Sequence, residues 1–153
     1  MRLSRKSDYA LRALVTLAEQ PGRTISIREL AEVNDVPRRF LEHIMLEMKS
    51  KGIVRSIAGR IGGFELAMAP EHVTIGRIVR LFDESLAPIP CVSATHYEPC
   101  TQEFKCRFRR ILLDIRNYTA KKMDEATLAM LISLTPVAKQ EVFTGQFLQG
   151  DGI

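Results

Sequence analysis

The three cysteines of this 153-residue chain all lie in one short stretch, CVSATHYEPCTQEFKC, between residues 91 and 106. Cys91, Cys100 and Cys106 follow the spacing C-x8-C-x5-C. An odd number of clustered thiols is a poor disulfide framework and indicates metal binding or redox chemistry in a reducing compartment. Thiolates are the preferred ligands of iron-sulfur clusters, and three of them on one loop leave a fourth cluster position open. The pattern therefore favours an iron-sulfur cluster, with 2Fe-2S and 4Fe-4S types both compatible.

Other chemistries remain open for the same loop. His96 lies between the first two cysteines and would complete a Cys3His tetrahedron around zinc, giving a zinc-dependent structural or interaction module. Thiol oxidation without any metal is a further reading. Inert packing is disfavoured because the intervening SATHYEP is polar. We do not expect an enzyme, since no ordered set of cysteine, histidine and acid is apparent.

Composition and charge narrow the class of protein. Hydrophobic residues at 46% and charged residues at 26% are typical of a globular domain, and no apolar run approaches the ~20 residues of a membrane span. The first residues are basic, but Asp8, Arg12 and Glu19 interrupt the apolar positions, which predicts a structural helix of a cytoplasmic protein rather than a signal peptide. Residues 1–80 carry 14 basic against 9 acidic side chains. This surplus favours a polyanion-binding face in the first half of the chain.

Helix signals in that half predict a helix-turn-helix. A first helix is expected from a cap at Ser7 to about Gln20, and a second begins at Ser26, which forms a capping box with Glu29. Pro37 suits the first turn of a third helix that stops near Gly52. Two short helices across a tight turn are typical of the helix-turn-helix motif.

A β-hairpin follows the third helix. The segments IVRSI and GFELA are rich in strand-forming residues and flank AGRIGG, a glycine-rich tip that carries Arg60. By itself this is an ordinary tight hairpin, but beside a helix-turn-helix it is a wing whose arginine can reach a DNA backbone or minor groove. The expected DNA-binding residues are Ser26, Arg28, Arg38, Arg39, Glu42, His43, Arg55 and Arg60, for which a solvated charged surface is the alternative.

The remaining elements complete a mainly α fold, a winged helix-turn-helix plus a long dimerisation helix. TIGRIVRLFDES predicts a fourth helix, and apolar residues from Phe108 recur at three- and four-residue steps, as in an amphipathic helix that could extend through DEATLAMLI. Such a helix suits a homodimer interface. The predicted organisation is a DNA-binding domain over 1–80, a cysteine-containing sensor loop over 81–107, a dimerisation helix over 108–135 and a tail over 136–153.

This order of elements resembles the bacterial regulator family of IscR, NsrR and RirA. The matching stretches are MRLSRKSDYALRAL, SIRELAEVNDVPRRFLEHIM, KGIVRSIAGRIGGFEL and the cysteine loop. The resemblance implies a homodimer of winged-helix subunits on a palindromic double-stranded DNA operator, with an iron-sulfur cluster as the sensor in many members and no cluster in others. It implies a transcriptional regulator that senses iron, nitric oxide or redox state.

Two positions depart from the pattern that this resemblance implies. The interval between Cys91 and Cys100 is longer than in cluster-binding relatives, and Arg109 stands where an IscR-like member has a histidine ligand. NsrR-like members use an aspartate of the first helix, which matches Asp8 here. Asp8 is therefore a candidate fourth ligand, although an acid in the first turn also stabilises a helix through its dipole. A regulator of the same family without a cluster, responding to thiol oxidation or a small ligand, is the alternative.

Overall fold

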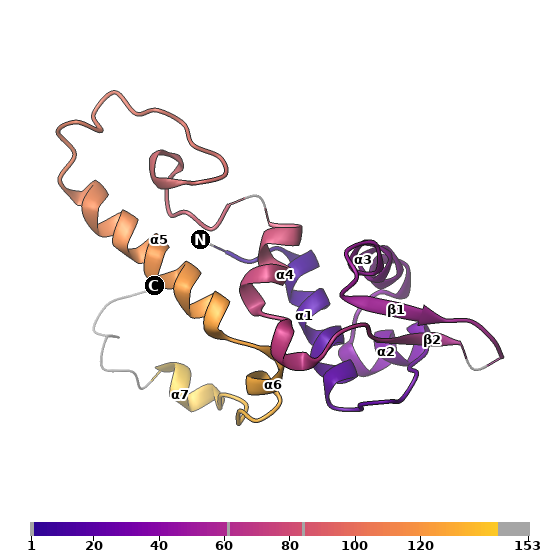
Figure 1. Ribbon diagram of the computed structural model, residues 1–153. Coiled ribbons are helices and arrows are strands. Elements are labelled where there is room, and N and C mark those ends of the chain that lie inside the picture. Colours follow the sequence, from indigo (N-terminus) through magenta and orange to yellow (C-terminus); the bar gives the residue numbers. More distant parts are fainter. Residues whose placement is uncertain (1, 61, 84, 144–153) are drawn as a thin grey trace.

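The computed structural model describes residues 2–60, 62–83 and 85–143 (Figure 1). Helices dominate, and the two strands form one antiparallel hairpin, which confirms the predicted fold class. In chain order the elements are α1 Arg5–Ala18, α2 Ile27–Asn34, α3 Arg38–Ser50, β1 Val54–Ile57, β2 Gly63–Leu66, η1 Pro70–His72, α4 Ile75–Phe82, η2 Pro90–Val92, α5 Phe108–Glu125, α6 Leu128–Leu131 and α7 Lys139–Phe143. The predicted tail therefore contains α7, and its residues 144–153 lie outside the described part of the chain.

The start of α1 differs from the prediction. Ser4, not Ser7, is the N-cap: its hydroxyl accepts a hydrogen bond from the backbone N–H of Ser7 at 3.2 Å. Ser7 lies inside the helix, fully buried, and donates from Oγ to the Asp83 carboxylate at 2.7 Å. Two serines three residues apart both suit a cap, and the tertiary contact with Asp83 decides which one is inside.

The turn between α2 and α3 follows its local sequence. Ser26 caps α2 by accepting from the backbone N–H of Glu29 at 3.2 Å, while the Glu29 carboxylate pairs with Arg23 at 2.7 Å. Asp35 ends α2 in the left-handed conformation, with φ of 51°. Pro37, whose ring fixes φ, then stands at the N-cap of α3. The helix-turn-helix is thus defined by caps on both sides of a short turn.

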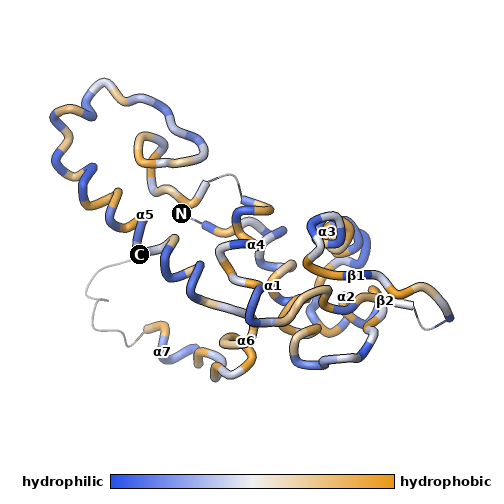
Figure 2. Tube along the Cα trace, viewed as in Figure 1, coloured by the Kyte–Doolittle hydropathy of each residue, from blue (hydrophilic) through white to orange (hydrophobic). Residues whose placement is uncertain are grey.

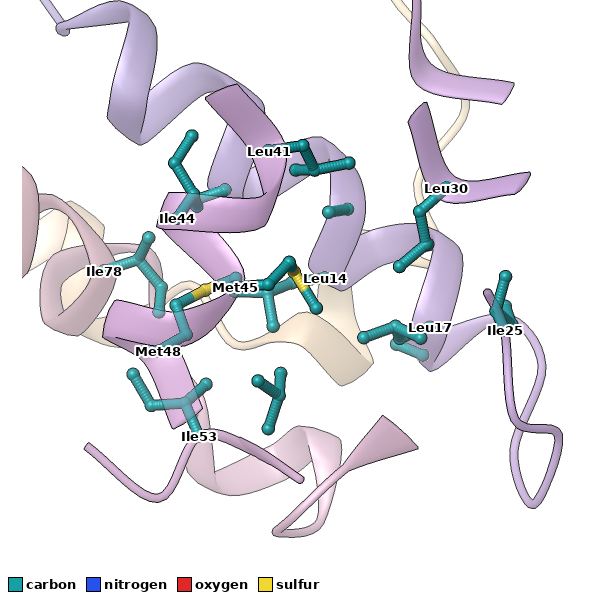
Figure 3. Close-up of a cluster of buried hydrophobic side chains, with 14 of the residues drawn as sticks. Leu14, Leu17, Ile25, Leu30, Leu41, Ile44, Met45, Met48, Ile53 and Ile78 are labelled. Atoms are coloured by element: carbon teal, nitrogen blue, oxygen red, sulfur yellow. The ribbon is translucent and has the colours of Figure 1, made fainter. Parts of the chain in front are cut away.

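One hydrophobic core holds α1, α2, α3 and α4 together. Figure 3 shows side chains from these helices meeting those of Ile25 and Ile53, which lie just before α2 and β1. The labelled residues are Leu14, Leu17, Ile25, Leu30, Leu41, Ile44, Met45, Met48, Ile53 and Ile78. Each labelled side chain is at most 3% exposed. Burying a large apolar side chain contributes about 1.5–3 kcal/mol, so this cluster fixes the orientation of α3 against α1.

The wing is fastened to the segment before α2. β1 and β2 pair with Val54 opposite Leu66 and Ile57 opposite Gly63. Phe64 also exchanges two backbone hydrogen bonds with Ile25, at 2.8 and 3.0 Å. Gly63 permits this contact, because a Cβ at that position would lie 2.2 Å from the Ile25 carbonyl oxygen. The hairpin consequently has a fixed position beside the helix-turn-helix.

The second half of the chain is built on α5. This helix ends at Glu125 rather than continuing through DEATLAMLI, because Ala126 is extended and Thr127 caps the short α6. Thr127 and Thr74 form an isolated β-bridge, which ties this break to the start of α4. No residue of α5 is fully buried, and Figure 2 shows apolar and polar residues alternating along this helix. In the described residues we find no helix whose length and apolar character would suit a membrane span.

Candidate functional site

The outer face of α3 presents basic and polar side chains. Leu41, Ile44, Met45 and Met48 point into the core. At about 100° per residue, the direction opposite to them is occupied by Arg39 and His43, both exposed. Arg38 and Glu42 lie on one flank of this line. The predicted recognition residues of α3 therefore share one accessible half of the helix.

Several cations on this side of the molecule are held by neighbouring carboxylates. Arg38 Nε donates to Glu42 at 3.0 Å, and Arg28 Nε donates to Glu32 at 2.8 Å, both one helical turn apart. The Glu32 contact raises the pKa of Arg28 above its usual value. Exposed pairs of this kind are weak because water screens both charges, so a phosphate can displace the carboxylate at low cost.

The wing carries two further predicted residues. Arg55 on β1 stands opposite Glu65 on β2, and its guanidinium donates twice to the Glu65 carboxylate, at 2.8 and 3.2 Å. The hydroxyl of Thr24 also donates to that carboxylate, and this bond, followed by Arg55, lowers the pKa of Glu65. Arg60 lies at the exposed tip, just after Gly59 with φ of 130°. Arg60 can therefore extend away from the hairpin body.

Sequence reasoning did not include Leu46 and Lys49 of α3. Leu46 is 55% exposed and falls on the same outer line as Arg39 and His43. An exposed leucine on a basic helix can contact a thymine methyl group in a major groove. Helical spacing from Arg39, seven residues earlier, would have identified Leu46.

All three cysteines line one open hollow at the other end of the molecule. This hollow has a volume of about 440 Å³, lies between η2 and the start of α5, and is bordered also by Ile89, Glu103 and Phe108. Cys91 is buried, Cys106 is half-buried and Cys100 is exposed, and all three thiols are free. Within the described residues, no three His, Cys, Asp or Glu side chains are gathered closely enough to hold a metal ion. The loop thus places the thiols around a common space without closing them on one point.

A chain of polar contacts anchors this loop to α5. Arg109 donates to the carbonyl oxygen of Cys91 from Nε at 3.2 Å and from Nη2 at 2.8 Å, and it pairs with Glu103 at 3.1 Å. The Tyr97 hydroxyl donates to the Glu103 carboxylate at 2.7 Å, a bond that raises the pKa of Tyr97. Arg109, which replaces the histidine expected in an IscR-like member, therefore positions the first cysteine.

The two candidate fourth ligands lie elsewhere. His96 borders a different hollow, and its Nδ1 is 3.1 Å from the Thr95 hydroxyl. Asp8 lies on α1, where Arg12 donates to both of its carboxylate oxygens at 2.8 and 3.0 Å. This bond to Asp8 raises the pKa of Arg12. Within one chain, neither residue borders the hollow formed by the cysteines.

A helix-turn-helix with a docked wing, a separate cysteine loop and a long exposed helix define a winged-helix transcriptional regulator. Residues 3–134 match the Rrf2 family, described as an iron-dependent transcriptional regulator. The chain belongs to this family, which confirms the predicted resemblance. Regulators of this family bind DNA and act as dimers. They are not enzymes, which agrees with the expectation from the sequence.

The chain is similar along most of its length to three bacterial regulators. It is 39% identical to an Rrf2-like HTH-type transcriptional regulator of Rhodobacter capsulatus, covering 90% of this chain and 97% of that protein. It is 30% identical to the HTH-type transcriptional regulator NsrR of Bacillus subtilis, covering 86% and 90%. The structure of CymR, the global cysteine regulator of B. subtilis, superposes with a TM-score of 0.76 at 27% identity, covering 89% of this chain and 99% of CymR.

Proposed function

We propose that this protein binds a palindromic DNA operator as a homodimer and senses iron, nitric oxide or redox state through an iron-sulfur cluster held by Cys91, Cys100 and Cys106. The observation that carries the DNA-binding part is the accessible basic face of α3 beside a wing of fixed position. The observation that carries the sensing part is the common hollow bordered by the three thiols.

The proposed DNA contacts divide by chemistry. Arg39 and His43, on the outermost line of α3, are suited to base edges in a major groove, and Glu42 can accept from cytosine. Arg28, Arg38 and Arg55 are suited to phosphates once they leave their carboxylate partners, and Ser26 lies at the helix N-terminus where a phosphate is favoured. Arg60 at the wing tip would follow the backbone or enter the minor groove.

The proposed dimer uses the exposed apolar stripe of α5. Phe108, Ile111, Ile115 and Tyr118 recur at three- and four-residue steps, and Phe108 and Ile111 are 65% and 60% exposed. A contiguous exposed stripe of this kind is typical of an interface between subunits. Two subunits paired through α5 would present two copies of α3, which must be about 34–36 Å apart to read successive major grooves.

The donor set of the cysteine hollow suits a cluster. Three thiols border one space, and no histidine or carboxylate other than Glu103 borders it among the described residues. Because the sulfurs do not converge in this conformation, cluster binding would draw Cys100 and Cys106 towards Cys91, whose backbone Arg109 holds. Asp8 would serve as a fourth ligand only by giving up Arg12 and by coming from the partner subunit's α1. A cluster would thereby connect loop closure to the position of α1.

A cluster-free regulator is the second candidate. The similarity to CymR, described as a cysteine regulator, favours a family member whose signal is not iron. In that case the exposed Cys100 would be the thiol open to oxidation. Zinc bound by the three cysteines is a third outcome of the same experiments.

The DNA-binding proposal is tested by removing three cations from the assigned face. The triple variant Arg38→Ala, Arg39→Ala, Arg60→Ala is compared with Lys121→Ala, Lys122→Ala, Lys139→Ala, which loses the same charge from α5 and α7. Binding to a palindromic duplex selected from a random library is followed by fluorescence anisotropy over a range of salt. The first variant should bind weakly and lose about 0.9 of log-log salt slope for each phosphate contact removed. Equal weakening by both variants would show that only net charge matters.

The cluster proposal is tested by anaerobic purification with iron, sulfide and zinc analysis. Cys91→Ala, Cys100→Ala and Cys106→Ala should each lose most iron and sulfide, whereas Thr101→Ala in the same loop should retain both. Wild-type protein that is colourless and contains stoichiometric zinc would show that the cysteine loop binds zinc rather than a cluster. Asp8→Ala should change the cluster spectrum if Asp8 is a ligand, and should cost about 0.3–1 kcal/mol of stability with an unchanged spectrum if it only stabilises the helix.

A further inference from the structure

A second hollow lies between α4, the segment after it, residues 93–96 of the cysteine loop and α5. Its volume is about 550 Å³, within the range of about 300–1,000 Å³ typical of small-molecule sites. Its lining is mostly apolar and includes Leu81, Leu86, Ala94 and Ala120, and Arg116 and Asn117 stand on its α5 wall. We name it the α4–α5 pocket.

Arg116 has an unmet hydrogen-bonding requirement in this pocket. Its Nε is buried and finds no hydrogen-bond partner among the described residues, while its Nη2 donates to the Asn117 side chain at 2.6 Å. Buried donors without partners are rare in folded proteins. An acceptor that carries negative charge in the hollow would complement the half-buried Arg116 guanidinium group.

The other charged groups of the pocket are already paired. Both terminal nitrogens of Arg80 donate to Asp124, at 2.5 and 2.6 Å. The carboxylate of Asp83 accepts from the Ser4 N–H at 3.1 Å and from the Ser7 hydroxyl at 2.7 Å. Arg116 is thus the lining cation whose charge has no carboxylate partner within the described part of the chain.

The pocket does not coincide with the apolar stripe of α5. At about 100° per residue, Arg116, Asn117 and Ala120 point to the side of the helix opposite Ile111, Ile115 and Tyr118. A dimer formed through the stripe would therefore leave the pocket wall of α5 facing its own α4, and the space would stay available to a ligand.

We propose that the α4–α5 pocket binds a small organic carboxylate with an apolar body. The carboxylate would pair with Arg116, whose planar guanidinium group matches two carboxylate oxygens, and the body would cover Leu81, Leu86 and Ala120. Asp83 on the pocket wall holds the first turn of α1, so the ligand would lie next to a contact that positions the DNA-binding half. No cysteine lines this pocket, although Ser93 and Ala94 of the cysteine loop do.

The test uses the full-length protein, uniformly 15N-labelled, with hexanoate and benzoate as probes and hexan-1-ol as the uncharged analogue. Saturable amide shifts at Ser93, Arg116, Asn117 and Ala120 are expected with at least one carboxylate, and binding of hexan-1-ol should be weaker than that of hexanoate by about tenfold. The absence of saturable shifts at these amides with both carboxylates would overturn the proposal.

Two variants assign the effect to the pocket. Arg116→Gln removes the positive charge but keeps a polar side chain and should weaken carboxylate binding by about tenfold, whereas Lys121→Gln removes one cation from the outer side of the same helix and should leave it unchanged. Ala120→Leu narrows the pocket on its α5 wall and should weaken binding even if Arg116→Gln proves unstable. Equal binding by wild type and Ala120→Leu would place the probe elsewhere and refute the site.

Discussion

Replacing Gly63 by alanine should release the wing from the helix-turn-helix. The added Cβ would lie 2.2 Å from the carbonyl oxygen and 2.5 Å from the carbonyl carbon of Ile25, both backbone atoms that no side-chain rotation can move. If β2 shifts to relieve the overlap, the two Ile25–Phe64 hydrogen bonds are lost at about 0.5–1.5 kcal/mol each. If β2 stays, the overpacking costs about 1–3 kcal/mol instead. Either response predicts a loss of about 1–3 kcal/mol of unfolding free energy.

The assay is urea unfolding at neutral pH, together with operator binding of the folded variant. Ser56→Ala on the neighbouring strand is the matched control, because Ser56 is exposed and such surface changes are usually within about 0.5 kcal/mol. Gly63→Ala should also weaken DNA binding while protein remains folded, since Arg60 would lose its fixed position. An unfolding free energy equal to that of Ser56→Ala would refute the reasoning about the docked wing.

Three further changes probe the core and the charged contacts. Leu14→Ala removes a fully buried side chain and should cost about 2–5 kcal/mol in urea unfolding, so a cost below 1 kcal/mol would contradict the assigned core. Arg80 lowers the pKa of Asp124, so this ion pair stabilises the protein above the usual carboxyl pKa of about 4. Wild type should therefore be more stable than Asp124→Asn at neutral pH, by at most about 1 kcal/mol because the pair is half-exposed. This difference in unfolding free energy should disappear as the pH falls through the lowered pKa of Asp124. Glu103→Ala should lower the pKa of Tyr97 towards its usual value of about 10, measured by NMR of 13C-labelled tyrosine. An unchanged pKa would show that the hydrogen bond to Glu103 does not raise it.

Local signals were sufficient to predict most of the winged helix. The capping residue Ser26, the turn at Asp35 and the glycine-rich hairpin tip act over a few residues, so their sequence patterns identify them directly. The cap of α1 and the end of α5 depend on distant partners instead. Ser7 is buried inside α1 because its hydroxyl donates to Asp83. The Thr74–Thr127 bridge ends α5 within DEATLAMLI, whose apolar spacing alone would continue the helix.

The same distinction applies to the candidate sites. The residue types and spacing of the three cysteines predicted a shared function, and they do border one hollow. The sequence could not show that Arg109 would fasten the Cys91 backbone, because that contact crosses the whole loop. Nor could it show the unpaired Nε of Arg116, since an arginine on a predicted amphipathic helix is ordinarily solvated.

The arrangement of the helices limits how a signal at the cysteine loop could reach DNA. The wing and the cysteine loop lie at opposite ends of the molecule, so a direct contact within one chain is not available (Figure 1). Between them, α4 is joined to α5 by the Arg80–Asp124 pair, with Gly76 allowing the close approach, and to α1 by the hydrogen bonds of Asp83.

From α1 the contacts continue to α3, the proposed recognition helix. Lys6 pairs with Glu47 of α3 at 2.9 Å, and the ring of Tyr9 meets Phe40 of α3 edge-on at 5.7 Å. The Lys6–Glu47 pair is half-exposed and weak, whereas the shared core holds α1 and α3 firmly together. A displacement of α1 by the loop or by a ligand in the α4–α5 pocket would therefore move α3 with it as one body. In a dimer, such a movement would change the separation of the two α3 helices rather than the shape of either one, and operator affinity depends directly on that separation.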